Sequence, residues 1–191
     1  ISVSLTADFE EIIKSYCEHA HDFWCFNKIE QGWSYGEAYN DIEKKHPLLK
    51  AYSTLSRKDQ SKYEDIAREA LKSMRILGWN VEKSEAAAGT TIKNASRLFS
   101  KKIRELKSAY IPKPYDLSNI TLTREQDDLA IQLSINYHHI WSKQKKFDLE
   151  NVGASLHHLL VPYELLTDRE KSKYLEFSFD LLKFLILNGY R

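Results

Sequence analysis

Apolar residues recur every three or four positions in several long stretches of this chain, a spacing that places them on one face of an α-helix. One stretch lies near the amino terminus, and a stretch in the second half repeats its spacing. The first contains Ile12, Ile13, Tyr16, Ala20, Phe23 and Trp24. The second contains Leu129, Ala130, Leu133, Tyr137, Ile140 and Trp141. We expect two long amphipathic helices here, with both tryptophans largely buried.

A second pair of stretches has the same helical spacing. One contains Tyr63, Ile66, Ala70, Leu71, Met74 and Leu77. The other contains Tyr174, Phe177, Leu181, Leu182 and Leu185. Gly78 and Gly189 follow directly and indicate the helix ends, because glycine readily adopts the left-handed conformation that closes a helix.

Hydroxyl residues mark where the helices begin. Ser56 and Thr167 each have an acid three residues later, a spacing typical of an N-cap. Thr6 and Thr123 hold the same place before the first pair of stretches, and residues 123–126 fit a capping box.

The four stretches belong to an internal repeat, which appears when the chain is aligned with itself. Residues 4–24 align with 121–141 at a shift of 117, and residues 46–79 align with 157–190 at a shift of 111. The six extra residues of the first copy fall near 31–37. Identical pairs include His21/His138, Trp24/Trp141, His46/His157, Tyr52/Tyr163 and Tyr63/Tyr174.

The repeat predicts the organisation of the chain. We expect one copy over 1–82, a linker over 83–109 that contains a short helix, and a second copy over 110–191. The fold class is mainly α, with short strands in extended pieces such as 119–122. A single helical hairpin cannot bury its apolar face alone, so the two pseudo-symmetric hairpins should pack together and unfold in one transition.

Composition narrows the class of protein. The 191 residues contain 28 Lys and Arg against 27 Asp and Glu, a net charge of +1. This balance argues against a nucleic-acid binder, which usually has a strong basic excess. No apolar run approaches the roughly 18 residues that a membrane span needs, so we also expect no direct membrane contact.

Candidate chemistry is sparse. The sequence has no catalytic motif, and its histidines and cysteines do not fall at metal-ligand spacing, so we expect no catalysis, no cofactor and no metal. Cys17 and Cys25 lie about 12 Å apart along a helix, too far for a disulfide. Two histidine pairs, His21/His138 and His46/His157, recur in both copies and are expected to serve packing and the connection between helices. Trp33 and Tyr35 lie in a glycine-flanked turn of the first copy only, which suggests a contact surface.

The linker is the candidate modification site. Residues 83–110 hold seven basic and two acidic residues, a net charge of +5. Ser100, with Arg97 three residues before it, is the leading candidate for a basophilic kinase, and Ser96 and Ser108 are weaker ones.

The same segment has a plainer interpretation as a solvated loop that drapes over the acidic first copy. Phe99, Ile103 and Leu106 also step like a helix face. A helix over about 95–109 would hinder a kinase, because kinases bind extended peptides.

The ordered motifs resemble the RyR repeat of ryanodine receptors, the large intracellular calcium-release channels. In the second copy the resemblance rests on residues 110–118, 138–141, 159–163 and 188–190. In the first copy it rests on residues 21–24, 28–29, 32–37 and 46–49. The second copy lacks the Gly-Trp-x-Tyr-Gly motif. In this respect the chain resembles the later of the two repeat pairs in these channels, which is called the phosphorylation domain.

This resemblance implies a helical, pseudo-symmetric regulatory domain on the cytoplasmic face of a homotetrameric channel in the sarcoplasmic or endoplasmic reticulum. Its partners would be other channel domains or protomers, and protein kinase A or calmodulin-dependent kinase would modify its loop. This chain departs from the family in that no paired basic residues directly precede a linker serine. Two alternatives stay open, namely a purely structural interaction module of the same channel and a soluble helical adaptor that binds an acidic partner through the linker.

Overall fold

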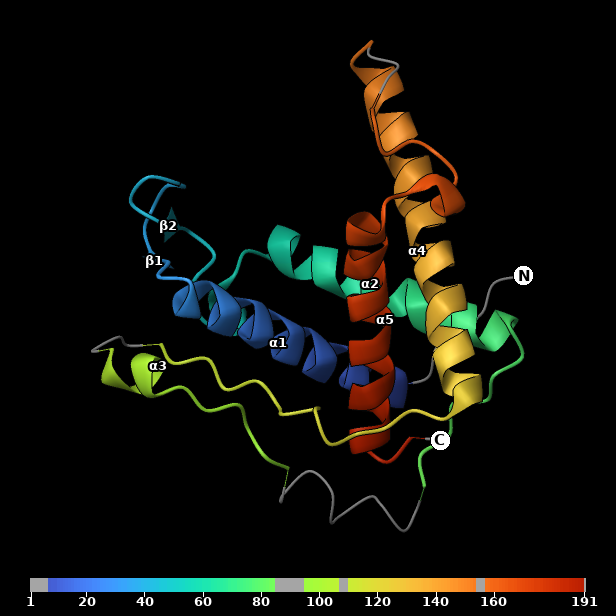
Figure 1. Cartoon of the computed structure of the whole chain (residues 1–191), viewed down its shortest axis with the longest axis horizontal. Helices are drawn as coiled ribbons and strands as arrows, with labels where there is room; N and C mark the ends of the chain where they lie inside the picture. Colours follow the sequence, from blue (N-terminus) through green and yellow to red (C-terminus); the bar gives the residue numbers. More distant parts are fainter. Residues whose placement is uncertain (1–6, 85–94, 107–109, 154–156, 191) are drawn as a thin grey trace. The chain divides into compact units, whose positions relative to one another are not determined.

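Helices make up most of this protein. The computed structural model describes residues 7–84, 95–106, 110–153 and 157–190. The helices of this part are α1 (Ala7–Glu30), α2 (Arg57–Ile76), α3 (Lys101–Glu105), α4 (Arg124–Asn151) and α5 (Asp168–Leu187) (Figure 1). The prediction of a mainly α fold is confirmed. None of the described helices combines the length and apolar character that a bilayer crossing requires.

The elements follow the repeat closely. A shift of 111 places α2 on α5 at both ends, and it places the 3-10 turn η1 (Tyr52–Thr54) on η3 (Tyr163–Leu165). A shift of 117 places the start of α1 on the start of α4, but α4 continues four residues beyond the equivalent of Glu30. The first copy leaves the helix there because Gly32, with a φ of +89°, closes α1.

Side-chain caps fix the helix starts as predicted. The Thr123 hydroxyl accepts from the Gln126 amide, and the Gln126 side chain accepts from the Thr123 amide, which completes a capping box. Thr167 and Glu170 form the same box at α5. Thr6, the predicted cap of α1, lies outside the described residues.

The start of α2 and the ends of α2 and α5 also agree with the sequence. Ser56 accepts from the Asp59 amide at 3.2 Å. Gly78 and Gly189 have φ angles of +88° and +81°, the left-handed conformation expected just after a helix.

All but three residues of the apolar stripes are buried or partly buried. Phe23 is 40% exposed and Ile140, its repeat equivalent, is 36% exposed, while Leu77 is 44% exposed beyond the end of α2. Trp24 and Trp141 are partly buried. Two residues before Phe23 and Ile140, each copy buries a histidine, His21 in the first and His138 in the second.

The short strands lie elsewhere than predicted. Residues 119–122 contain no strand, and the strands are β1 (Ser34–Tyr35) and β2 (Lys45–His46), which pair in parallel within the longer middle of the first copy. A Cβ on Gly36 would lie 2.7 Å from the Lys45 Cβ, so this close approach requires glycine. Residues 119–122 lead directly into a helix cap and lack the paired backbone that a strand needs.

The chain divides into two compact units that differ from the two copies of the repeat. The first unit contains Ile1–Arg68 and Gly89–Asn119, which include most of the linker. The second contains Glu69–Ala88, with the first residues of the linker, and Ile120–Arg191. The boundary falls within α2, so this one helix contributes residues to both units.

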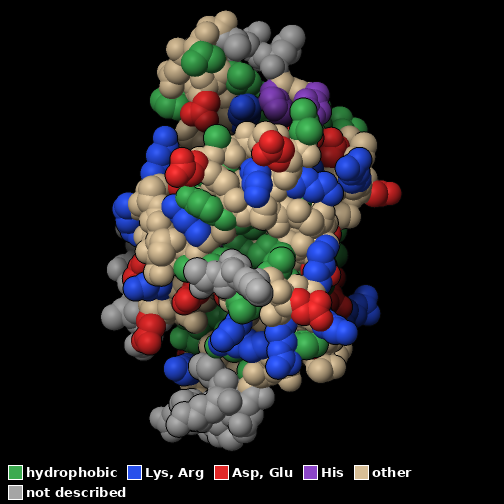
Figure 2. Space-filling view, turned by 90° about the vertical axis from the view of Figure 1, so that its left-hand side faces the viewer, with side chains coloured by type: hydrophobic (Ala, Val, Ile, Leu, Met, Phe, Trp, Pro, Cys, Tyr) green, Lys and Arg blue, Asp and Glu red, His purple; other side chains and the backbone are tan. Residues whose placement is uncertain are grey.

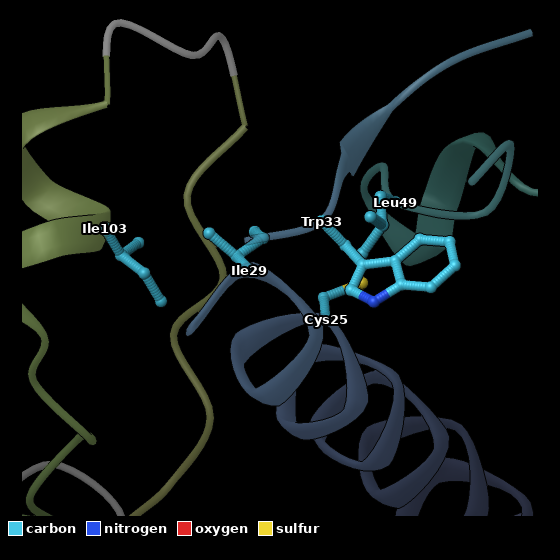
Figure 3. Packing of buried hydrophobic residues seen from close by; sticks show 5 residues of the cluster. All are labelled: Cys25, Ile29, Trp33, Leu49 and Ile103. Atoms are coloured by element: carbon cyan, nitrogen blue, oxygen red, sulfur yellow. The ribbon is translucent and has the colours of Figure 1, made fainter. Parts of the chain in front are cut away.

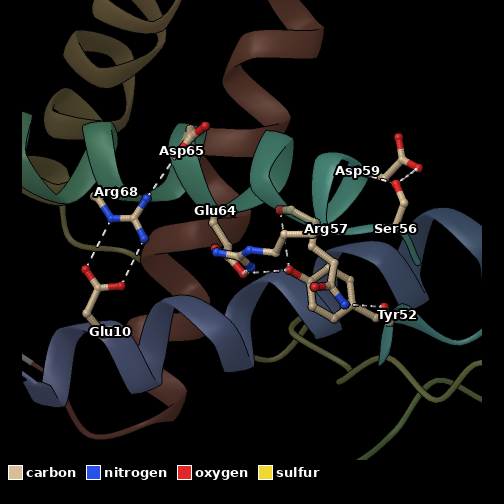
Figure 4. A network of polar contacts seen from close by, with 9 residues as sticks. Glu10, Tyr52, Ser56, Arg57, Asp59, Glu64, Asp65 and Arg68 are labelled. Carbon is tan, nitrogen blue, oxygen red and sulfur yellow. Dashed lines mark hydrogen bonds and ion pairs between the residues drawn. The ribbon is translucent and has the colours of Figure 1, made fainter. Parts of the chain in front are cut away.

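Polar contacts in the first unit connect α2 to α1, and others lie within α2 or join it to η1 (Figure 4). Arg68 donates to both carboxylate oxygens of Glu10, at 3.2 and 2.9 Å. Arg57 makes a two-pronged contact with Glu64 at 2.7 and 2.8 Å, and Tyr52 also donates to Glu64. The Arg57 contact is the main reason that the pKa of Glu64 lies below its ordinary value.

The core of the second unit forms where α4 packs against α5. Phe184 is fully buried there, and Leu129 and Leu181 are almost fully buried. Asn136 of α4 donates to Ser73 of α2 at 2.6 Å. Outside the cores, basic and acidic side chains are interspersed over the visible face (Figure 2), as the balanced composition predicts.

Candidate functional site

The end of the linker pairs with the start of the second copy, as two extended segments over residues 96–98 and 114–116. The Leu98 amide donates to the Pro114 carbonyl at 2.9 Å, and the Asp116 amide donates to the Ser96 carbonyl at 2.8 Å. Arg97 lies over the Tyr115 ring, 3.4 Å from its centroid. Because these residues are extended and paired, the helix predicted over about 95–109 is wrong at its start.

Ser100 caps the short helix α3 that follows. Its hydroxyl oxygen accepts from the Ile103 amide at 3.1 Å, and its hydroxyl donates to the Glu30 carboxylate at the end of α1. Lys102 donates to the Glu30 backbone carbonyl at 2.7 Å. The leading candidate serine is therefore partly buried at the point where the linker meets the first copy.

Ile103 anchors α3 in an apolar cluster of the first unit. It is 3% exposed and belongs to a group with Cys25, Ile29, Trp33 and Leu49 (Figure 3). Phe26 and Tyr110 pack against the same group. The linker thus contributes an apolar side chain to the core of the first copy and is not merely draped over it.

The two residues predicted to form a contact surface, Trp33 and Tyr35, differ in their exposure to solvent. Trp33 is 8% exposed within the apolar cluster, so its half of the prediction is wrong. Its turn folds inward, and Lys28 covers its ring at 4.5 Å from the centroid. Tyr35 is 51% exposed and remains available to a partner.

Asp22 of α1 holds the returning segment, residues 110–115, which follows the linker at the start of the second copy. Its carboxylate accepts from the Tyr110 hydroxyl at 2.6 Å and from the Lys113 amide at 3.1 Å. Three residues earlier, His19 accepts from the Tyr115 amide at 3.1 Å. The returning segment therefore runs antiparallel to α1 (Figure 1).

A histidine at the same place in each copy ties the helices to the connecting segment. In the first copy His21 contacts the Lys50 carbonyl through Nε2 at 2.8 Å and the Tyr63 hydroxyl through Nδ1 at 3.1 Å. A carbonyl only accepts, so Nε2 carries the proton and Nδ1 accepts from the tyrosine. Burial lowers the pKa of His21, which favours this neutral form.

The second copy repeats this arrangement. His138 contacts the Val161 carbonyl at 2.8 Å and the Tyr174 hydroxyl at 3.0 Å, and these partners are the repeat equivalents of those of His21. The prediction that the recurring histidines serve packing is confirmed for this pair.

The remaining titratable groups do not form a reactive set in the described part of the chain. Cys17 and Cys25 are free and buried, and burial raises the pKa of each thiol to about 12, so both are protonated at neutral pH. No group of three or more potential metal ligands occurs among the described residues.

Of the candidate serines, Ser96 is exposed, Ser100 is partly buried and Ser108 lies outside the described residues. Sequence reasoning did not identify Asp22 and Glu30, which hold the linker in place. The excess of acidic residues in the first copy pointed toward a contact with the linker, whose net charge is +5. Charge alone, however, does not select these two from the fourteen Asp and Glu residues of the first copy.

Comparison with known families gives a direct result. The family model of the RyR domain matches residues 1–83 and, separately, residues 110–191. The two matches correspond to the two copies of the internal repeat and together cover most of the chain. The chain therefore belongs to the RyR domain family, a family of ryanodine-receptor-type channel proteins, and carries two RyR repeats in tandem.

Proposed function

We propose that this chain is a non-catalytic regulatory domain of an intracellular calcium-release channel, and that phosphorylation of its inter-repeat linker changes how the linker docks. The observation that carries the proposal is the position of Ser100, which joins the linker to Glu30 of α1. The sequence around it supplies Arg97, the basic residue that such kinases select. Membership in the RyR domain family supplies the channel context.

A phosphate on Ser100 would weaken the docked state. It adds about −1.5 to −2 charges at neutral pH, directly opposite the Glu30 carboxylate. It also removes the hydroxyl proton that Glu30 accepts. Lys102 is already engaged by the Glu30 carbonyl, so it offsets only part of the repulsion while that contact lasts. Modification would therefore favour release of α3 and its neighbours from the first repeat.

Docking also controls access by the kinase. Ser100 is partly buried and caps a helix, whereas a kinase needs the surrounding residues extended and free. We expect slow phosphorylation of the wild type by protein kinase A or calmodulin-dependent kinase. Ile103→Ala should speed it, because this change weakens the apolar anchor three residues away.

The test is a phosphorylation time course with mapping of the modified peptides. Ser100→Ala should remove most of the phosphate gained within 84–108. Ser96→Ala is the matched control, because Ser96 is exposed and its contact with the Asp116 amide uses the backbone carbonyl, which the substitution keeps. Phosphate found only outside 84–108, or none under conditions that modify a control substrate, would reject the regulatory-loop proposal.

A structural interaction module of the same channel is the second candidate function. The burial of Ile103 in the first repeat favours it, since a docked linker needs no modification to hold its place. The partners would be other domains or protomers of a homotetramer on the cytoplasmic side of the reticulum membrane, with exposed Tyr35 as a contact. Tyr35→Ala should then weaken assembly with the rest of the channel without changing the stability of this domain.

A further inference from the structure

The second repeat has an open groove between α4 and the segment that leads into η3. Its cavity volume is about 320 Å3. One wall carries His139, Lys143 and Lys146 of α4, and the other carries Leu160, Val161 and Pro162. The whole groove lies within the second compact unit.

The equivalent surface of the first repeat is the docking site of the linker. A shift of 117 places His139, Lys143 and Lys146 on Asp22, Phe26 and Ile29. In the first repeat Asp22 accepts from Tyr110, while Phe26 and Ile29 belong to the cluster that receives Ile103.

The opposite wall matches as well. A shift of 111 places Leu160 on Leu49, which is a buried member of the same cluster. The same face of the RyR repeat therefore receives the linker in one copy, through the apolar anchor Ile103 of α3 and through the extended residues that contact Asp22. In the other copy, the described residues leave this face as an open groove.

The charge of the two faces is opposite. The acid that holds the linker in the first repeat is replaced by His139, and two apolar residues are replaced by Lys143 and Lys146. Glu150 contacts Lys146 at the long distance of 4.0 Å, and both side chains are largely exposed, so this weak pair leaves the lysine able to bind a partner's carboxylate. A basic segment like the linker would be repelled here, whereas carboxylates would be attracted.

We propose that this groove binds an acidic, extended peptide segment of a partner protein. Aspartate or glutamate side chains of the partner would pair with Lys143 and Lys146, and an apolar side chain between them would pack against Leu160 and Val161. The arrangement parallels the docked linker with the charges exchanged. It does not depend on phosphorylation of the linker.

The binding experiment uses the full 191-residue chain and a fluorescently labelled synthetic peptide. The peptide carries leucine and tyrosine flanked by aspartates and glutamates, and its control replaces every acid by asparagine or glutamine. Fluorescence anisotropy should give saturable binding of the acidic peptide only. The affinity should fall as salt rises, because exposed charge pairs are screened.

Charge-reversal variants locate the site. Lys143→Glu and Lys146→Glu should each weaken binding by roughly tenfold or more, the usual size of a lost charge-assisted contact. Lys58→Glu is the matched control, because it makes the same charge change at an exposed position of the first unit. All three side chains are exposed, so an unchanged circular dichroism spectrum should show that each variant folds.

Several results would overturn the proposal. These are equal binding of the neutral peptide, an equal effect of Lys58→Glu, and absence of saturable binding. Competition by inorganic phosphate at the peptide's own concentration would indicate a general anion site instead. Binding of phosphatidylserine vesicles without binding of the peptide would assign the groove to a membrane surface.

Discussion

Replacing Ile103 by alanine tests whether the linker is truly part of the first repeat's fold. Ile103 is the buried residue of α3, and its side chain is 3% exposed. The change removes three carbons, worth about 2.4 kcal/mol at roughly 0.8 kcal/mol for each buried methylene. The cavity left against Ile29 and Leu49 raises the expected cost into the range of about 2–5 kcal/mol.

The cost should appear first as local release of the linker, because α3 has five residues and few other contacts. Hydrogen exchange measures this release at the Leu98 and Asp116 amides, which pair the end of the linker with the start of the second copy. A loss of about 2 kcal/mol corresponds to roughly 30-fold faster exchange. Exchange in α5 should change much less, since α5 belongs to the second unit.

Phe99→Ala is the matched control for this experiment. Phe99 lies in the same segment and is 70% exposed, so its replacement should change stability by less than about 0.5 kcal/mol. If Ile103→Ala leaves exchange at Leu98 and Asp116 unchanged, or if Phe99→Ala has the same effect, then Ile103 does not hold the linker and the docking argument fails.

Three further predictions concern local contacts. The pKa of His21 is lowered in the folded protein, so the unfolded chain takes up the proton first and the free energy of unfolding should fall as the pH drops below about 6.5. Urea denaturation at pH 7.5 and 5.5 should show this loss of stability, and the loss should be smaller in His21→Gln. Thr167→Ala removes a capping contact of α5 and should cost about 1 kcal/mol in urea denaturation, and no measurable loss would contradict the cap. Arg57 lowers the pKa of Glu64, so the stability from this pair should be present above about pH 4.5 and disappear as the pH falls through the pKa of the folded state. Because the Arg57 side chain is 71% exposed, a double-mutant cycle should give a coupling energy of no more than about 1 kcal/mol.

Local chemistry let the sequence alone determine the helices and their limits. The capping boxes at Thr123 and Thr167 and the glycine after α5 act over a few residues, so their spacing is enough to predict them. The repeat also predicted a structural role for His21 and His138, because a residue kept in both copies while its neighbours differ is held by contacts that both copies share.

Contacts between residues far apart in the chain were decided only by the tertiary structure. Ser100 meets Glu30 across 70 positions, and Tyr110 meets Asp22 across 88. Charge patterning indicated that the linker would favour the first repeat but did not select these acids. The inward fold of the Trp33 turn likewise depends on the apolar cluster that receives it.

The groove of the second repeat shows most clearly what each level decides. Where the first copy has Asp22, Phe26 and Ile29, the second copy has a histidine and two lysines, and the alignment of the two copies alone reveals this difference. Only the tertiary structure shows that Asp22, Phe26 and Ile29 of the first repeat lie where Tyr110 and Ile103 pack. An alignment compares residue types, whereas burial depends on which distant segment covers them, and that is set by packing of the whole chain.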